Sequence, residues 1–223
     1  MPSFRTFSLT SLLAVSLLGT SARSQDHPTE HTVVPLDNFA PGQWVEKVSG
    51  DFTKHEPFVL RIHNDAGYIV FPHTHPIDEN ITVVKGSWAL GMGRLFDRSA
   101  LKPMELGSFG IAPKGMDHFA YANTDSILQV HGIGPFTSTV ADAVYELNGE
   151  GVFLLTSLLR PGTPTTSAPS NCFTLKVGAH VHATRGEGAV VGARCSPANK
   201  LTQYWIQKPT GERFWATLPE LRR

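Results

Sequence analysis

The sequence predicts an all-β protein in which one large β-barrel is followed by a smaller β module. Between Glu56 and Phe136 the chain consists of short runs rich in Val, Ile, Phe and Trp, and these runs are separated by Gly, Asp, Asn or Pro. Runs of this length and spacing are typical of β-sandwiches and β-barrels. Similar short runs resume after residue 171. Helical periodicity is scarce, and residues 140–148 fit either a short helix or a terminal strand.

The N-terminal residues 1–24 have the features of a secretory signal peptide. Arg5 gives a positive start, and residues 8–19 form an apolar stretch that is too short to span a bilayer. Small residues at Ala22 and Ser24 then form a cleavage pattern, with cleavage after Ser24 and cleavage after Ala22 as the alternative. We therefore expect a signal peptide over residues 1–24 and a secreted or periplasmic mature protein without a transmembrane segment. An uncleaved N-terminal anchor is the alternative.

The chain divides at a segment that is rich in proline, serine and threonine. Residues 160–171 contain three prolines and a Ser/Thr cluster, which is typical of a linker or exposed loop. We expect a barrel domain over residues 25–150, a linker over 151–171 and a small β module over 172–223. The module resembles SH3-like small barrels through its alternating valines and the tryptophans of its second hairpin.

The two parts carry opposite net charges. Residues 25–150 contain 8 basic and 16 acidic side chains, whereas residues 171–223 contain 8 basic and 3 acidic ones. This asymmetry fits two parts that complement each other electrostatically, or a basic C-terminal part that binds an unknown acidic partner. No basic run is dense enough to indicate nucleic-acid binding.

Two histidines and a glutamate in the segment FPHTHPIDE, residues 71–79, form the start of a metal site. Pro76 biases the residue before it toward an extended backbone, and side chains alternate along an extended chain, so His73 and His75 face the same way. A turn after them can bring Glu79 back beside the two imidazoles. Asp78 is the rival carboxylate, but on a strand its side chain points away from that of Glu79.

His118 is the candidate for a fourth ligand. It follows a turn at residues 113–115, which contains proline and glycine and returns the chain toward the barrel. Three neutral imidazoles and one carboxylate suit one divalent transition metal, which can be Fe, Mn, Ni, Cu, Co or Zn. Four protein ligands also leave coordination positions for water or substrate.

These residues match the two sequence motifs of the cupin superfamily. The first motif, G-x5-H-x-H-x3-E-x6-G, is matched at all of its fixed positions, which are Gly67, His73, His75, Glu79 and Gly86. The second motif, G-x5-P-x-G-x2-H, is matched at Gly107, Pro113, Gly115 and His118. Asn123 lies one residue later than the asparagine that usually closes this motif. Over residues 35–148 the chain resembles secreted single-domain cupins.

The resemblance implies a double-stranded β-helix, or jelly-roll, barrel that binds a metal through His73, His75, Glu79 and His118. Cupins host many reactions, so the fold does not fix the function. We expect a secreted metal-dependent protein that acts on a small, partly apolar molecule as a dioxygenase-like oxygenase. The alternative is a non-enzymatic, metal-dependent small-ligand-binding protein with a C-terminal partner-binding module. An isomerase or epimerase is disfavoured, because such cupins usually need no metal. Catalytic residues, substrate and oligomeric state, a homodimer included, stay open.

Several residues outside the tetrad bear on the pocket. We expect mainly apolar residues to line it, namely Phe71, Trp88, Met92, Phe119 and Tyr121. His131 lies near the end of an apolar run, and we expect it to be structural, with a place in the pocket as the alternative. His180 and His182 form a second H-x-H pair, but no carboxylate follows at a suitable distance, so we expect an ordinary strand pair.

Cys172 and Cys195 are the two cysteines of the chain, and we expect them to form a disulfide. An exported protein meets an oxidising compartment, and two cysteines permit one bridge. A hairpin of residues 172–183 with 187–196 would bring the two cysteines within a bulge or two of facing each other. Two separate buried thiols are the alternative.

Overall fold

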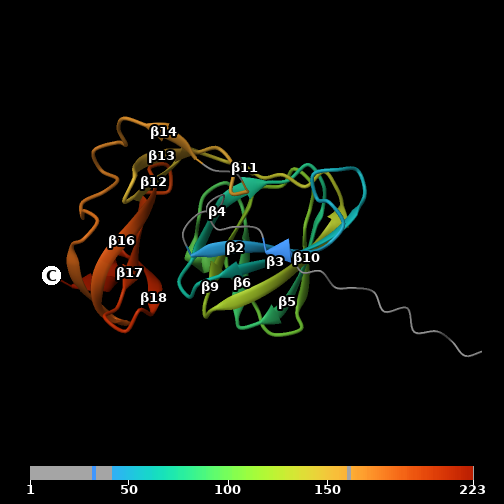
Figure 1. The fold of residues 1–223 in the computed structure, drawn as a ribbon. Helices are drawn as coiled ribbons and strands as arrows, with labels where there is room; N and C mark the ends of the chain where they lie inside the picture. The colour runs from blue at the N-terminus through green and yellow to red at the C-terminus, as the bar shows by residue number, and fades with distance from the viewer. Residues whose placement is uncertain (1–31, 34–41, 160–161, 223) are drawn as a thin grey trace, which may run out of the picture.

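The computed structural model describes residues 32–33, 42–159 and 162–222, and the expected signal peptide lies outside these ranges. The described chain forms three antiparallel β-sheets and two 3-10 turns, η2 (Arg98–Ala100) and η3 (Leu218–Glu220), with no α-helix. The first two sheets form one lobe and the third forms the other (Figure 1). Among the described residues, no helix has the length and apolar character needed to cross a membrane.

The first two sheets enclose the predicted barrel. In spatial order, the first sheet contains β1 (Thr32–Val33), β2 (Gln43–Ser49), β3 (Pro57–Asn64), β10 (Ser126–Ile133), β5 (Glu79–Lys85) and β8 (Phe109–Ala112). The second contains β11 (Thr139–Val140), β4 (Ile69–Thr74), β9 (His118–Ala122), β6 (Trp88–Met92) and β7 (Lys102–Met104). Strands distant in sequence lie side by side, as β3 and β10 do, which is the pattern of a jelly roll. The all-β, jelly-roll prediction is confirmed.

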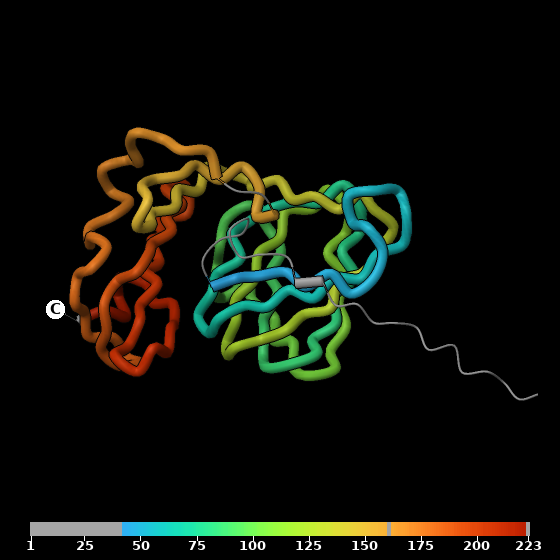
Figure 2. Tube along the Cα trace, viewed as in Figure 1, coloured from blue at the N-terminus to red at the C-terminus, as the bar shows by residue number. Residues whose placement is uncertain are grey.

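The barrel core lies between these two sheets. Alternate residues of the strands point inward, so that Leu60 and Ile81 of the first sheet belong to one buried cluster with Val70 and Leu90 of the second. The tube view shows this closed lobe beside the lobe of the third sheet (Figure 2).

The third sheet is centred on one long strand. Its strands are β14 (Thr163–Thr165), β13 (Gly151–Leu155), β12 (Val144–Asn148), β16 (Gly186–Ser196), β15 (His180–Ala183) and β19 (Leu221–Arg222). β17 (Leu201–Gln207) also pairs with β16, and β18 (Arg213–Thr217) pairs with β17. A separate buried cluster that includes Val190, Tyr204, Ile206 and Phe214 stabilises this sheet.

The third sheet begins earlier in the chain than the sequence predicts. Residues 140–148, which fit either a short helix or a strand, contain the strand β12. β12 lies in the range 25–150 that the sequence assigns to the barrel, but it belongs to the third sheet. β13 and β14 lie in the range 151–171 assigned to a linker. A tight turn joins β12 to β13. Asn148 Oδ1 stabilises this turn by accepting a hydrogen bond from the amide of Glu150 at 2.8 Å. The expected linker is therefore folded in part, while the likeness of the module to SH3 barrels stays a prediction.

Side chains of the third sheet cover the outer edge of β4. On that edge, β4 pairs with β11 only over its last two residues. Gln203 on β17 forms hydrogen bonds with the backbone that precedes these two residues. Its Nε2 donates to Gly67 O at 2.7 Å, and its Oε1 accepts from Ile69 N at 3.1 Å. Gly67 has a φ of +86°, and a Cβ there would lie 2.5 Å from Trp215 O. The third sheet is therefore packed directly on β4, the strand of the first cupin motif that carries His73.

Cys172 and Cys195 form a disulfide in the structure. Cys195 lies on β16, whereas Cys172 lies in the irregular segment between β14 and β15. The hairpin is shorter than the sequence predicts, because only His180–Ala183 pairs with Gly186–Ala189. Cys172 thus reaches Cys195 from a crossing segment rather than from a paired strand.

Thiol counting on the denatured, unreduced protein is expected to find no free thiol. Reduction should then destabilise the third sheet by about 3 kcal/mol, because the bond closes a loop across a sequence separation of 23. Urea unfolding followed by tryptophan fluorescence measures this change. Metal content should stay constant, since neither cysteine belongs to the barrel. Two free thiols per chain would contradict the bridge, and metal loss on reduction would contradict the division into two parts.

Candidate metal centre

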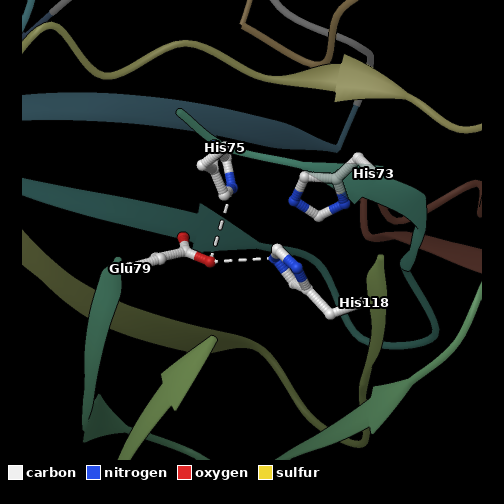
Figure 3. Close-up of side chains that lie close together, drawn as sticks. All are labelled: His73, His75, Glu79 and His118. Atoms are coloured by element: carbon white, nitrogen blue, oxygen red, sulfur yellow. Dashed lines mark hydrogen bonds and ion pairs between the residues drawn. The ribbon is translucent and has the colours of Figure 1, made fainter. Parts of the chain in front are cut away.

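Four buried side chains converge inside the barrel (Figure 3). His73 lies near the end of β4, His75 follows that strand, Glu79 opens β5 and His118 opens β9. One ligand atom from each residue lies within 4.8 Å of the others, and none of the residues is more than 6% exposed. Within the described ranges, no second group of three or more His, Cys, Asp or Glu residues has this arrangement.

An irregularity in β4 directs the two histidines of the first motif inward. The pairing of β4 with β9 shifts register between Val70 and His73. Val70 lines the barrel cavity, whereas Phe71 packs outside against the third sheet. Strict alternation from Val70 would place Pro72 inside and His73 outside. The bulge adds one residue to the count and so places His73 and His75 on the cavity side.

A backbone carbonyl holds each imidazole in place. The Nδ1 atoms of the three histidines bond to carbonyl oxygens, His73 to Phe71 at 2.8 Å, His75 to Thr137 at 2.6 Å and His118 to Met116 at 2.9 Å. A carbonyl oxygen can only accept a hydrogen bond, so Nδ1 is the donor in each ring. In the neutral ring the lone pair is therefore on Nε2, which is the protonation state that a metal ligand requires.

Glu79 is the electrostatic partner of these imidazoles. Its Oε2 lies 3.1 Å from His118 Nε2 and 3.5 Å from His75 Nε2. Burial alone would raise the pKa of Glu79, but the nearby imidazoles outweigh burial and hold that pKa well below its usual range. Glu79 is therefore a carboxylate at neutral pH and can act as an anionic ligand.

The histidines differ in their affinity for protons. Burial would lower the pKa of His118, but the hydrogen bond and charge of Glu79 outweigh it and raise that pKa above its ordinary value. Burial, followed by the charges of His118 and His75, holds the pKa of His73 well below its ordinary value. In the metal-free site a proton therefore binds between His118 and Glu79, and a bound metal would replace that proton.

The rival carboxylate, Asp78, has a structural contact instead of a place in the site. Its Oδ1 accepts the amide of Lys114 at 2.7 Å, and the amide of Gly115 bonds to His75 O at 2.9 Å. These contacts tie the turn before His118 to the segment that carries the other ligands. The two cupin motifs therefore hold each other in register.

The buried group of three imidazoles and one carboxylate fits one divalent transition metal. His73, His75, Glu79 and His118 would hold it, and all four sequence-predicted ligands come together. A metal bound by these residues supplies a Lewis acid and a template with positions left for small molecules.

The cavity beside the ligands is mainly apolar. Its volume is about 30 Å³. The apolar lining residues are Ile62, Val70, Trp88, Ala120, Leu128, Phe136, Leu158 and Leu159, and the polar ones besides the ligands are Gln43, Asn64 and Ser138. Phe136 stacks on His75 with ring centroids 4.3 Å apart. The cavity thus combines one polar, metal-binding side with apolar walls.

The sequence-based list of pocket residues was wrong except for Trp88. Phe71 and Tyr121 belong to a cluster with the third sheet, outside the cavity. Phe119 is buried against Phe96, with ring centroids 5.3 Å apart, and Met92 is 41% exposed. The lining residues that were missed include Phe136, Leu158 and Leu159. Leu158 and Leu159 form an apolar pair inside the expected linker, and this pair is the signal in the sequence for a buried position.

The remaining candidate histidines lie away from the metal centre. His131 does not line the cavity, and it stacks on Phe109 with ring centroids 6.5 Å apart. His180 and His182 are exposed on β15. His182 Nδ1 lies 3.3 Å from Glu187 Oε2 on the neighbouring strand. His180 and His182 are therefore an ordinary strand pair, as expected. A surface contact between two exposed groups, His182 and Glu187, does not form a metal-binding cluster.

Metal is expected to leave the protein as the pH falls below about 6. Protons compete with the metal for the imidazoles, and Glu79 raises the pKa of His118 so that this ring takes up a proton first. Metal content after dialysis at a series of pH values down to about 4 measures the release. Full retention at the lowest pH would mean that histidines are not the ligands.

No protein-family model and no curated protein matches this chain. Among solved structures, the chain is similar to KdgF from Halomonas sp., with 21% identity, a TM-score of 0.37, and coverage of 46% of this chain and 86% of that one. An RmlC-like cupin from Shewanella frigidimarina has 20% identity, a TM-score of 0.38, and coverage of 46% and 82%. Salicylate 1,2-dioxygenase from Pseudaminobacter salicylatoxidans has 17% identity, a TM-score of 0.37, and coverage of 43% and 27%. The likeness to cupins therefore depends on the jelly-roll sheets, the two motifs and the four converging ligands of this chain itself.

Proposed function

We propose that this protein is an exported, metal-dependent oxygenase that acts on a small, partly apolar molecule. The single observation that carries the proposal is the position of the donor set. Three imidazoles and one carboxylate lie at the edge of a mainly apolar cavity inside the barrel. A metal held there has free coordination positions, and the apolar walls exclude bulk water from them.

Two buried donors favour a substrate that carries an acceptor oxygen. Asn64 Nδ2 and Trp88 Nε1 belong to residues that line the cavity, and neither atom has a hydrogen-bond partner among the described residues. A buried donor without a partner costs free energy, so such donors in a cavity suggest a bound acceptor. Asn64 is positioned by its own Oδ1, which accepts from Gln43 Nε2 at 3.0 Å. We therefore assign Asn64 and Trp88 to substrate binding.

The residues around the metal site have three different roles. The carbonyl bonds to Nδ1 keep the imidazoles oriented and their Nε2 atoms free for a metal. Glu79 stays ionised beside His118 and can hold a proton in exchange with that ring. Phe136 supports His75 from the cavity side.

Metal analysis followed by oxygen uptake tests the proposal. The purified mature protein should contain close to one transition-metal ion per chain, and oxygen uptake should depend on one member of a panel of phenols, diketones and short acids. Asn64→Leu should reduce that uptake without loss of metal, because Asn64 is not a metal ligand and its hydrogen bond is to Gln43. Bound metal with no uptake for any compound would favour the non-enzymatic binding protein.

Export is the part of the proposal that concerns residues 1–24. The apolar stretch and the cleavage pattern support it, and a disulfide is typical of exported proteins. N-terminal sequencing of the protein from the periplasm or medium should give Gln25 as the first residue, or Arg23 if cleavage follows Ala22. An intact Met1 on cytoplasmic protein would contradict export.

A further inference from the structure

A segment next to the third sheet forms part of the metal cavity. Leu158 and Leu159 follow β13 and line the same cavity as the four metal ligands. Leu158 is 5% exposed and belongs to the core cluster of the barrel, and Leu159 packs against that cluster. The connection after β13 therefore reaches into the barrel. We name residues 156–159 the cavity wall.

Hydrogen bonds hold the cavity wall in a defined position. Ser138 and Ser157 are both buried, and their hydroxyl groups bond to each other at 3.0 Å. Ser138 Oγ accepts the amide of Leu158 at 2.8 Å, and Ser157 Oγ accepts the amide of Leu159 at 3.1 Å. The amide of Val140, on the strand beside β4, bonds to the carbonyl at residue 156 at 3.2 Å. Two barrel residues, Ser138 and Val140, thus bond to the backbone of the wall, and Ser157 adds a bond within it.

The cavity wall leaves little room beside the ligands. The cavity volume of about 30 Å³ is that of one or two water molecules. Sites for drug-sized ligands have volumes of about 300 to 1,000 Å³. An apolar cavity that binds benzene has a volume of about 150 Å³, so the cavity here is too small for an aromatic ring while its lining side chains, Leu158 and Leu159 among them, keep this position.

We propose that Leu158 and Leu159 are specificity-determining residues that set the largest molecule admitted to the metal site. This inference rests on the proposed function and deepens it. It removes phenols from the panel of candidate substrates and leaves short-chain carbonyl compounds and short acids. The residues come from outside the two cupin motifs. They act through the volume that their side chains occupy.

The first test uses the Co(II)-loaded protein, with azide as the small probe and imidazole as the larger one. Visible absorption of the cobalt reports binding of each. In Leu158→Ala, the affinity for imidazole should rise by about tenfold or more, while the affinity for azide stays the same. Leu155→Ala is the matched control. Leu155 is 4% exposed and lies three residues earlier, but it packs with Phe71 outside the cavity.

The second test uses the metal-free protein, so that it does not depend on metal binding. Fluorobenzene binding, followed by fluorine NMR, should appear in Leu158→Ala and be absent in the wild type and in Leu155→Ala. Leu159→Ala, which changes a less buried side chain, gives the same readout if Leu158→Ala fails to fold.

The two proposals can fail separately. If the wild type takes up no cobalt, the proposed function is contradicted, and fluorobenzene still decides the role of the wall. If cobalt and azide bind but the leucine variants bind imidazole and fluorobenzene no better than the wild type, the assignment of the wall is overturned.

Discussion

Replacing His73 or His118 with alanine is expected to remove most of the bound metal. Each substitution takes away one of four ligands, and among the described residues no further histidine belongs to the group and could replace the lost one. Loss of residues that only orient metal ligands costs about 10- to 100-fold in affinity, so loss of a ligand should cost at least about 100-fold. Metal analysis and competition with a chelator measure the effect.

His180→Ala is the matched control for these variants. His180 belongs to the second H-x-H pair, but it is exposed on β15 and lies outside the metal-binding group. This variant should retain the metal content of the wild type. An equal loss of metal from His180→Ala would contradict the assignment of the tetrad. Circular dichroism of each variant separates loss of a ligand from loss of the fold.

The metal centre could be predicted because its information is local in the sequence. His73, His75 and Glu79 lie within one short segment, and Pro76 restricts the backbone between them. The glycine and proline residues of the second motif mark the fourth ligand, His118. Turn residues at fixed spacing identify such segments even when the strands themselves are variable.

The walls of the cavity were harder to predict, for two different reasons. On β9, strict alternation from His118 places Ala120 inside, as the structure has it, and turns Phe119 and Tyr121 away from the cavity. On β4, the same alternation from His73 would place Phe71 inside. A bulge between Val70 and His73 reverses that count. Pro72 lies inside this stretch, and a proline within a strand is the one local sign of such a bulge.

The boundary between the two parts could not be read from composition. β12 leaves the barrel to pair with β16, where residues 145–147 face residues 193–195. Such long-range pairing depends on the whole fold rather than on local turn signals. The proline-rich composition of residues 160–171 therefore predicts a linker, although the leucines just before it are part of the cavity wall.

One buried charge lies where the third sheet packs on β4. Arg194 on β16 is 0% exposed, and its guanidinium carbon lies 4.8 Å from the ring of Tyr68 and 4.9 Å from that of Phe71. Its Nη1 donates to Ile69 O at 3.2 Å. Glu146, which is directly opposite on β12, is 7% exposed. The arginine therefore supplies both a donor to β4 and a positive charge beside a buried carboxyl group.

Replacing Arg194 with alanine is expected to destabilise the metal-free protein by about 3 to 5 kcal/mol at neutral pH. The change leaves a cavity and removes the charge that favours ionised Glu146. Urea unfolding measures the free energy of unfolding. Arg213→Ala is the control, because Arg213 is an exposed arginine 4.7 Å from the ring of Trp205, and its loss should cost no more than about 1 kcal/mol.

The pH dependence of this loss identifies its cause. Burial raises the pKa of Glu146 above its ordinary value, and the charge of Arg194 opposes that rise. Without Arg194 the pKa rises further, so folding with an ionised Glu146 is penalised above the unfolded-state pKa of about 4.3, and the penalty disappears as the pH falls below it. The destabilisation by Arg194→Ala should therefore be smaller near pH 4 than at neutral pH. A loss of stability that is equal at both pH values would assign the effect to packing and to the bond with Ile69 O, and a loss below about 1 kcal/mol would contradict the role of Arg194 between the two parts.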